Sequence, residues 1–225
     1  MKIIAVVGIR ASGKTTVVEN LVRVLAQRGH AVGTVKTIAC PAFHMDKPGS
    51  NTERHILAGA APVTARAQDE TTVLYPRHLL PSEILEHYRN CDYVLWEGDY
   101  QIPVPRIVCA RQSADALERI NAHTLALSGR LADSLSELNG LPVVHVLQDP
   151  QRLADLLEAL PETDADLKAL DTPMNGHDAE VSGVFCAKAC QGHPPKSSLT
   201  VMLDGRPFSL TEEQKAQILA WVTKS

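Results

Sequence analysis

The chain has 225 residues, of which 44% are hydrophobic and 21% charged, and its formal net charge is −4. This composition is typical of a soluble globular protein with a full core, and the length allows one large domain or one domain with an appendage. The net negative charge does not indicate binding to nucleic acid, and no apolar run is long enough to span a membrane. The odd count of 5 cysteines argues against a secreted disulfide framework, so a cytoplasmic protein is expected.

The first predicted strand, Lys2–Val7, is a short apolar run rich in β-branched residues, as a buried parallel strand should be. It leads into Gly8–Thr16, which fits the phosphate-binding pattern of glycine, four residues, then Gly-Lys-Ser/Thr. Apolar residues recur at helical spacing from Lys14 onward, so a helix is expected to follow. Strand, glycine loop and helix together present backbone N–H groups and a helix N-terminus to a phosphate chain. The sequence therefore predicts a nucleotide site here.

Single residues of this glycine loop have expected roles. Gly8 and Gly13 let the backbone turn and approach the phosphates closely. Lys14 is expected to reach the β- and γ-phosphates and neutralise charge that develops there, and the Thr15 hydroxyl is expected to ligate Mg²⁺. The remaining expected nucleotide contacts are Arg10, Ala11, Ser12 and Thr16. Arg10 is also the nearest candidate for an arginine finger, although we favour a solvated side chain.

A second strand is expected over Ala31–Lys36, followed by a long irregular stretch rich in proline. Such a stretch after a strand is where α/β enzymes place substrate loops. The elements expected next are a short helix over Asn51–Leu57, two strands that could form a hairpin over Pro62–Ala67 and Thr71–Leu74, and a helix from Pro81 to about Arg89.

An acidic residue ends the next buried strand, Asp92–Glu97. Phosphate-loop enzymes carry their second Mg²⁺-associated element in this form. Glu97, or Asp99 two residues later, could orient the metal, its waters or an attacking water. The alternative is a strand-end acid that caps the next loop. We favour the functional interpretation because ligands of open α/β sheets bind at the carboxyl ends of strands.

Strands and helices alternate through the rest of the first 160 residues. Strands are expected over Arg106–Ala110, His123–Leu127 and Pro142–Leu147, and helices over Ser113–Arg119, Arg130–Leu138 and Pro150–Leu160. This alternation predicts an α/β fold, a mostly parallel P-loop NTPase sheet flanked by helices on both faces, over residues 1–160. Residues 161–225 are expected to form a linker and a small C-terminal extension, with a strand over Leu199–Leu203, a turn at Asp204-Gly205 and a helix from Thr211.

The C-terminal extension contains Cys186, Cys190 and His193. Cysteines four residues apart face the same way on a helix, and His177 could complete a tetrahedral set. The hypothesis is a Zn²⁺ or iron–sulfur site. The alternative is two ordinary small core residues and a surface histidine, because the spacing is not that of a standard zinc pair.

Three segments in suitable order resemble the molybdopterin-guanine dinucleotide biosynthesis protein B (MobB) family. They are Asp46–Ala60, Asp92–Gly98 and Pro105–Arg111, and the resemblance covers about residues 2–158. It implies a GTP-binding P-loop protein, usually a homodimer, with slow hydrolysis, which assists the MobA-type guanylyltransferase that joins GMP to molybdopterin. The loop residues carry over as phosphate and Mg²⁺ contacts and Glu97 as the metal-side acid. The resemblance also implies that Asp46, Arg54 and His55 face the nucleotide or the pterin, although a solvated helix face explains Arg54 and His55 equally well.

The sequence departs from the family pattern at several points. The stretch Thr37–His44 is not histidine-rich, Asn51 stands where an aspartate is usual, and Ser128 is followed by Gly129 and not by an aspartate. No Asn-Lys-x-Asp motif supplies a carboxylate for guanine, so the preference for GTP over ATP comes from the resemblance alone. The alternatives are a metallochaperone GTPase, a small-molecule kinase that uses ATP, and a binding adaptor with vestigial hydrolysis.

Overall fold

The computed structural model describes residues 1–40, 43–98, 101–163, 166–172, 201–203 and 206–208. The chain divides into a larger unit, Met1–Ile38 with His44–Ala179, and a smaller unit, Ala39–Phe43 with Glu180–Ser225. The larger unit holds the central sheet and the glycine loop. None of the helices in the described part of the chain is long and apolar enough to cross a membrane.

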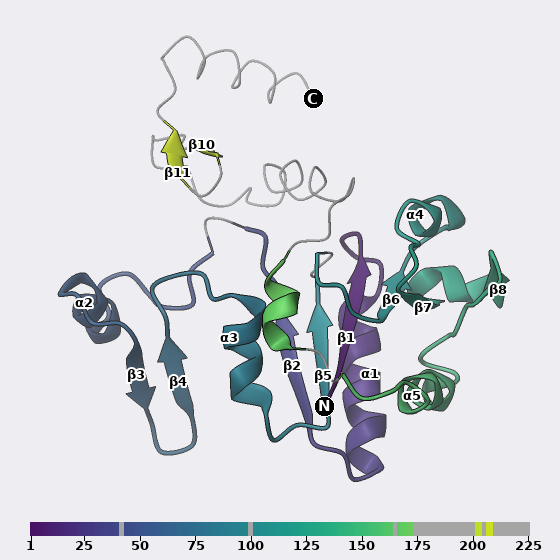
Figure 1. Cartoon of the computed structure of the whole chain (residues 1–225), viewed down its shortest axis with the longest axis horizontal. Helices are drawn as coiled ribbons and strands as arrows, with labels where there is room; N and C mark the ends of the chain where they lie inside the picture. Colours follow the sequence, from purple (N-terminus) through teal and green to yellow (C-terminus); the bar gives the residue numbers. More distant parts are fainter. Residues whose placement is uncertain (41–42, 99–100, 164–165, 173–200, 204–205, 209–225) are drawn as a thin grey trace. The chain divides into compact units, whose positions relative to one another are not determined.

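A five-stranded sheet of order β2-β5-β1-β6-β7 forms the centre of the larger unit, and every neighbouring pair in it is parallel (Figure 1). Its strands are β1 (Lys2–Gly8), β2 (Val32–Lys36), β5 (Tyr93–Glu97), β6 (Arg106–Cys109) and β7 (Thr124–Ser128). β5 and β6 are buried along their whole length. Continuous apolar runs therefore form this sheet because both of its faces are covered.

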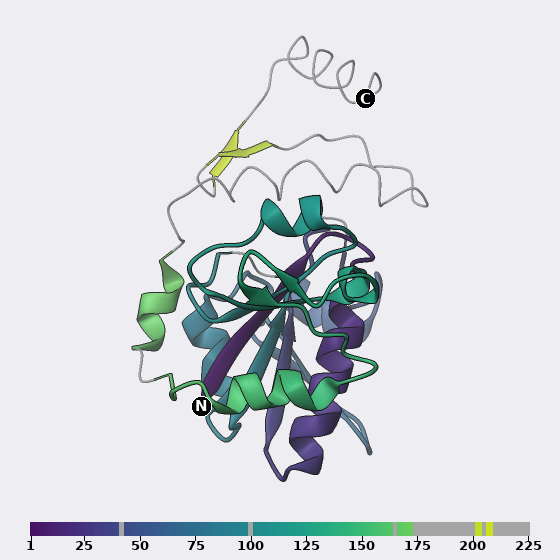
Figure 2. The same ribbon diagram turned by 90° about the vertical axis from the view of Figure 1, so that its right-hand side faces the viewer.

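Helices cover the two faces of the sheet, as the sequence predicts. On one face, α1 (Lys14–Gln27) and α5 (Pro150–Glu158) pack in one core cluster, which includes Leu21 and Leu153. On the other, Leu85, Ala116 and Leu170 share a second cluster. These three residues belong to α3 (Pro81–Leu85), α4 (Ser113–Leu117) and the 3-10 helix η3 (Leu167–Asp171). Figure 2 shows α1 and η3 on opposite sides of the sheet. The predicted fold class is confirmed.

A helix and a hairpin lie beyond the sheet edge that β2 forms (Figure 1). Strands β3 (Val63–Arg66) and β4 (Thr71–Leu74) pair antiparallel, and α2 (Asn51–Leu57) packs beside β3. The sequence predicts all three. The helix from Pro81 is shorter than predicted, since α3 ends at Leu85 and continues as the 3-10 helix η1 (Glu86–Tyr88).

The predictions for two elements after β7 are wrong. The expected helix over Arg130–Leu138 is a 3-10 turn, η2 (Gly129–Asp133), followed by β8 (Glu137–Leu138), which pairs antiparallel with β9 (Leu141–Pro142). The turn between β8 and β9 is Asn139-Gly140, both at positive φ, which is a hairpin signal that the prediction missed.

Of the expected strand over Pro142–Leu147, Pro142 belongs to β9 and Val143 forms one parallel bridge with Leu127. The backbone carbonyl of His145 accepts the N–H groups of Gln148 and Asp149, which turns the chain into α5. Asp149 caps α5 by accepting from the N–H of Arg152. This turn ends the strand before it can form a ladder.

The region predicted as a linker contains the 3-10 helix η3, which contacts α3. The carboxylate of Asp171, at the end of η3, accepts hydrogen bonds from the N–H (2.9 Å) and hydroxyl (2.7 Å) of Ser82 in α3. The boundary at residue 160 stays a prediction. In the smaller unit, β10 (Val201–Leu203) and β11 (Arg206–Phe208) pair antiparallel, which agrees with the predicted strand. The predicted turn, the final helix, and Cys186, Cys190, His193 and His177 lie outside the described residues.

Candidate functional site

The glycine loop between β1 and α1 has a backbone that only glycine accommodates at two positions. Gly8 has a φ of +149°, and a Cβ there would lie 2.1 Å from the carbonyl oxygen of Cys109. Gly13 has a φ of +101° and immediately precedes α1. Ala11 also takes a positive φ of 58°, which is costly for a residue with a side chain. The loop is therefore held in a tightly turned conformation.

The N-terminus of α1 offers hydrogen-bond donors at this loop. Gly13 is the N-cap residue and provides no side-chain cap, so the first N–H groups of this 14-residue helix have no intrahelical acceptor. Ser12 is fully buried, and among the described residues its Oγ has no hydrogen-bond partner. Unpartnered donors and the positive end of a helix dipole suit an anion. The loop thus fits the phosphate chain that the sequence predicts for it.

Lys14 points back over the loop. Its Nζ donates to the carbonyl oxygens of Gly8 at 2.8 Å and Ile9 at 2.7 Å. Burial lowers the pKa of the Lys14 amine, and the nearby Glu97 carboxylate acts in the opposite direction. The ammonium group therefore lies within the loop. Its acceptors are neutral carbonyl oxygens, which charged phosphate oxygens can replace.

Thr15 and Glu97, which the sequence predicts as the Mg²⁺ pair, lie together. The Thr15 Oγ1 donates to Glu97 Oε1 at 3.0 Å, and the Glu97 side chain is buried at the carboxyl end of β5. Hydroxyl and carboxylate oxygens are the ligands that Mg²⁺ prefers. The two residues would fit Mg²⁺ through one direct oxygen and through bound water.

Lys36 completes this cluster, and the sequence analysis missed it. The parallel register of β2 on β5 sets Lys36 beside Glu97, and the Lys36 Nζ lies 3.0 Å from Glu97 Oε1. Both residues end their strands, so their side chains meet at one edge of the sheet. Strand order and register decide this contact, and neither is visible in the sequence.

A cavity of about 470 Å³ opens beside the loop. Its lining includes residues 11–16 of the loop and of α1. A second group of lining residues comes from later in the chain: Gly129, Arg130, Asp133, His145, Val146 and Leu147. Within this second group, His145 Nε2 and Asp133 Oδ1 are 3.0 Å apart. The sequence analysis missed the second group because it comes from the segments whose structure was predicted wrongly.

The loop and η2 are in close contact. A Cβ added to Gly129, whose φ is +85°, would lie 2.1 Å from the carbonyl oxygen of Ser12. The N–H of Leu131 donates to the carbonyl of Ala110 at 2.9 Å, which ties η2 to the end of β6. The loop and η2 are therefore fixed relative to each other by backbone contacts.

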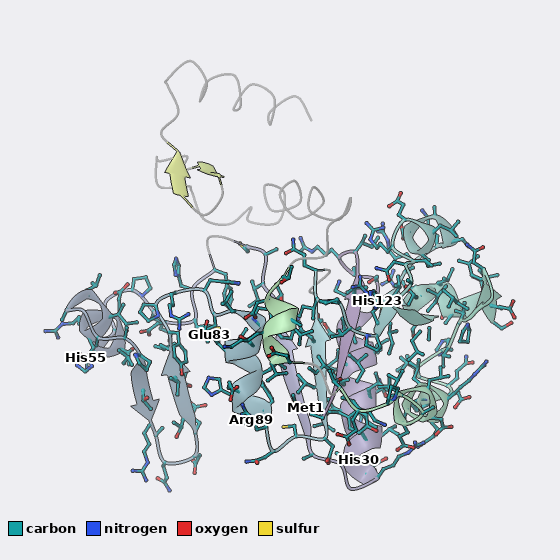
Figure 3. The ribbon with its side chains drawn as sticks, in the orientation of Figure 1. Met1, His30, His55, Glu83, Arg89 and His123 are labelled. Carbon is teal, nitrogen blue, oxygen red and sulfur yellow. The ribbon has the colours of Figure 1, made fainter. Side chains whose placement is uncertain are left out.

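Asp46, Arg54 and His55 belong to a different part of the larger unit. Asp46 Oδ2 accepts from the hydroxyls of Thr52 at 2.5 Å and Ser50 at 2.8 Å, and these bonds lower the pKa of the Asp46 carboxyl. Asp46 thus organises the start of α2. Arg54 and His55 are exposed on α2, and Figure 3 shows His55 beside the hairpin of β3 and β4. A ligand role for these three residues stays a prediction.

In the part of the chain that the structure describes, no group of three or more His, Cys, Asp or Glu residues could hold a metal ion by itself. The Zn²⁺ or iron–sulfur hypothesis for Cys186, Cys190 and His193 concerns residues outside this part.

Comparisons with known proteins agree on one family. The family model described as molybdopterin guanine dinucleotide synthesis protein B (MobB) matches residues 3–128. The chain is 28% identical over 167 residues to a probable molybdopterin-guanine dinucleotide biosynthesis adapter protein of Bacillus subtilis, covering 70% of this chain and 92% of that protein. A putative adapter protein of the same description from Methanocaldococcus jannaschii is 29% identical over 130 residues, covering 55% of this chain and 53% of that protein.

Solved structures are similar as well. The crystal structure of Bacillus subtilis MobB aligns with a TM-score of 0.57 and 25% identity over 72% of this chain and 99% of that one. The MobB homolog from Bacillus stearothermophilus aligns with a TM-score of 0.52 and 24% identity over 70% and 97%. The family match includes the glycine loop and Glu97, and it ends before Asp133 and His145.

Proposed function

Since this chain belongs to the MobB family, which confirms the resemblance seen in its sequence, we propose that it binds GTP with Mg²⁺ at the glycine loop and acts as an adapter in molybdopterin guanine dinucleotide biosynthesis. The observation that carries the proposal is the contact of Thr15 with Glu97 beside the half-buried Lys14. The adapter role is supported by the descriptions of the two relatives.

The residues of the chain would divide the binding of GTP among them. The N–H groups at the start of α1 would donate to phosphate oxygens. Lys14 would exchange the carbonyls of Gly8 and Ile9 for phosphate oxygens, which are stronger acceptors because they are charged. Thr15 would provide a hydroxyl ligand to Mg²⁺, and Glu97 would hold the waters of the ion. When bound, Mg²⁺ would neutralise phosphate charge.

Two features of the site support slow hydrolysis. The Glu97 carboxylate contacts Thr15 and Lys36, and in the GTP complex it would hold the waters of the Mg²⁺ ion. Arg10 is exposed within the loop. Efficient catalysis by P-loop proteins needs a residue that orients the attacking water and a cation on the transferred phosphate. We therefore propose that turnover is slow and that the bound GTP serves a MobA-type guanylyltransferase and its molybdopterin, with the chain acting as a homodimer.

The test is calorimetric titration of the purified full chain with GTP, ATP and their diphosphates, each with Mg²⁺. We expect selective binding of GTP, which Lys14→Ala abolishes and the exposed Lys168→Ala leaves unchanged. Circular dichroism checks that both variants are folded. Undiminished GTP binding by Lys14→Ala would refute the site. A preference for ATP would favour the kinase alternative, which transfer of the γ-phosphate to an acceptor would then establish.

A further inference from the structure

The cavity beside the glycine loop is larger than a phosphate chain needs, and its lining includes a carboxylate, that of Asp133. We propose that Asp133 reads the base of the nucleotide, accepting hydrogen bonds from the N1–H and the 2-amino group of guanine. This inference rests on the proposed binding of a nucleotide at the loop. It names the residue that would make the site selective for guanine.

The arrangement of the cavity gives the direction of the nucleotide. Its volume of about 470 Å³ falls within the range of small-molecule sites. If the phosphates lie on the N–H groups of Gly13 and Lys14, the rest of the cavity is left for the base, and the lining of that cavity includes Asp133. Val146 and Leu147 line the cavity as well, and their apolar side chains suit the face of a purine ring.

Asp133 is held in place although it is exposed. Its side chain is 66% exposed, so a ligand can reach the carboxylate. His145 Nε2 lies 3.0 Å from Asp133 Oδ1 and orients it. A carboxylate has about four lone-pair positions, so Asp133 can accept from His145 and from two N–H groups of a base. Gly129, packed on the carbonyl of Ser12, fixes the start of η2 against the loop.

The chemistry of a carboxylate discriminates between purines. Guanine presents two adjacent donors, N1–H and the 2-amino group, and both can bond to the two oxygens of one carboxylate. Adenine has an acceptor at N1 and no 2-amino group, so it would leave the carboxylate facing a lone pair. A site built to accept from a donor strongly rejects a ligand that lacks that donor. The sequence contains no Asn-Lys-x-Asp motif that would supply a carboxylate for guanine. Asp133 would supply that carboxylate instead.

The experiment compares GTP, ATP and XTP in calorimetric titrations of the full chain and of Asp133→Asn. Xanthine carries an oxygen in place of the 2-amino group, and the N–H of an asparagine can donate to this oxygen. We expect Asp133→Asn to lower the affinity for GTP about tenfold to a hundredfold. We also expect this variant to bind XTP more tightly than the wild type does. The control is Glu137→Gln, which removes the same charge four residues away, in β8 and outside the cavity lining. It should change neither affinity.

The outcomes separate the two proposals. If Lys14→Ala loses GTP binding while Asp133→Asn keeps the GTP and XTP affinities of the wild type, the role of Asp133 is overturned. The proposal that GTP binds at the loop would still stand. A wild type that binds no nucleotide would overturn both. Gain of XTP binding cannot come from an unfolded variant, so this result would support the proposal even if Asp133→Asn lowers stability.

Discussion

Gly129→Ala tests whether the glycine loop depends on the turn that packs against it. Gly129 has a φ of +85°, and a Cβ there would lie 2.1 Å from the carbonyl oxygen of Ser12 and 2.9 Å from that of Ala110. The left-handed backbone costs an alanine about 1–2 kcal/mol. The two neighbours are backbone atoms that cannot rotate away, and such overpacking costs roughly 1–3 kcal/mol more. The expected loss of unfolding free energy is therefore about 2–5 kcal/mol.

Gly29→Ala is a matched control for this substitution. Gly29 has nearly the same φ, +89°, and a Cβ there meets nothing within 4 Å. It should lose only the backbone contribution of about 1–2 kcal/mol. Urea unfolding followed by tryptophan fluorescence, to which the buried Trp96 in β5 contributes, measures both variants. Nucleotide affinity should fall in Gly129→Ala alone. Equal losses of stability in the two variants would refute the claim that the contact with Ser12 matters.

Two further predictions concern carboxylates. Glu97→Gln removes the charge next to Thr15 and Lys36, and we expect it to lower GTP affinity about tenfold in Mg²⁺ and much less without it. Titrations with and without Mg²⁺ measure this, and the same ratio in both conditions would contradict it. Arg77 beside Glu83 lowers the pKa of that carboxyl to about 2 from an ordinary value of 4.5, so its contribution to stability is present above about pH 4.5 and is lost as the pH falls toward 2. Glu83→Gln should flatten the decline of unfolding free energy across that window, and parallel curves would count against the pair.

Much of the larger unit could be predicted from the sequence because its signals are local. The buried strand Lys2–Gly8, the glycine loop and the helix after it form one continuous pattern. The contact of Thr15 with Glu97 was also predictable, since the carboxyl ends of parallel strands meet at one edge of a sheet. Position in a motif or at a strand end was enough in these cases.

The rest of the site depends on contacts between distant segments. Lys36 reaches Glu97 only because β2 lies next to β5 in register, and the sequence does not give strand order. His145 falls in an apolar run that resembles a strand, but its carbonyl turns the chain into α5. Its ring therefore lies beside Asp133 and not on a sheet face. Because this short run was predicted as a strand, its contribution to the cavity lining was missed.

The glycine after Ser128 bears on the proposed role of Asp133. The family resemblance leads one to expect an aspartate at that position, where this sequence has Gly129. A Cβ at this position would collide with the carbonyl of Ser12, so an aspartate there would displace the glycine loop. The next carboxylate along η2 is Asp133, at the end of the same turn and in the same cavity. On this reasoning the double variant Gly129→Asp/Asp133→Asn should fail to restore GTP binding, and its recovery of wild-type affinity would show that the loop tolerates a side chain there.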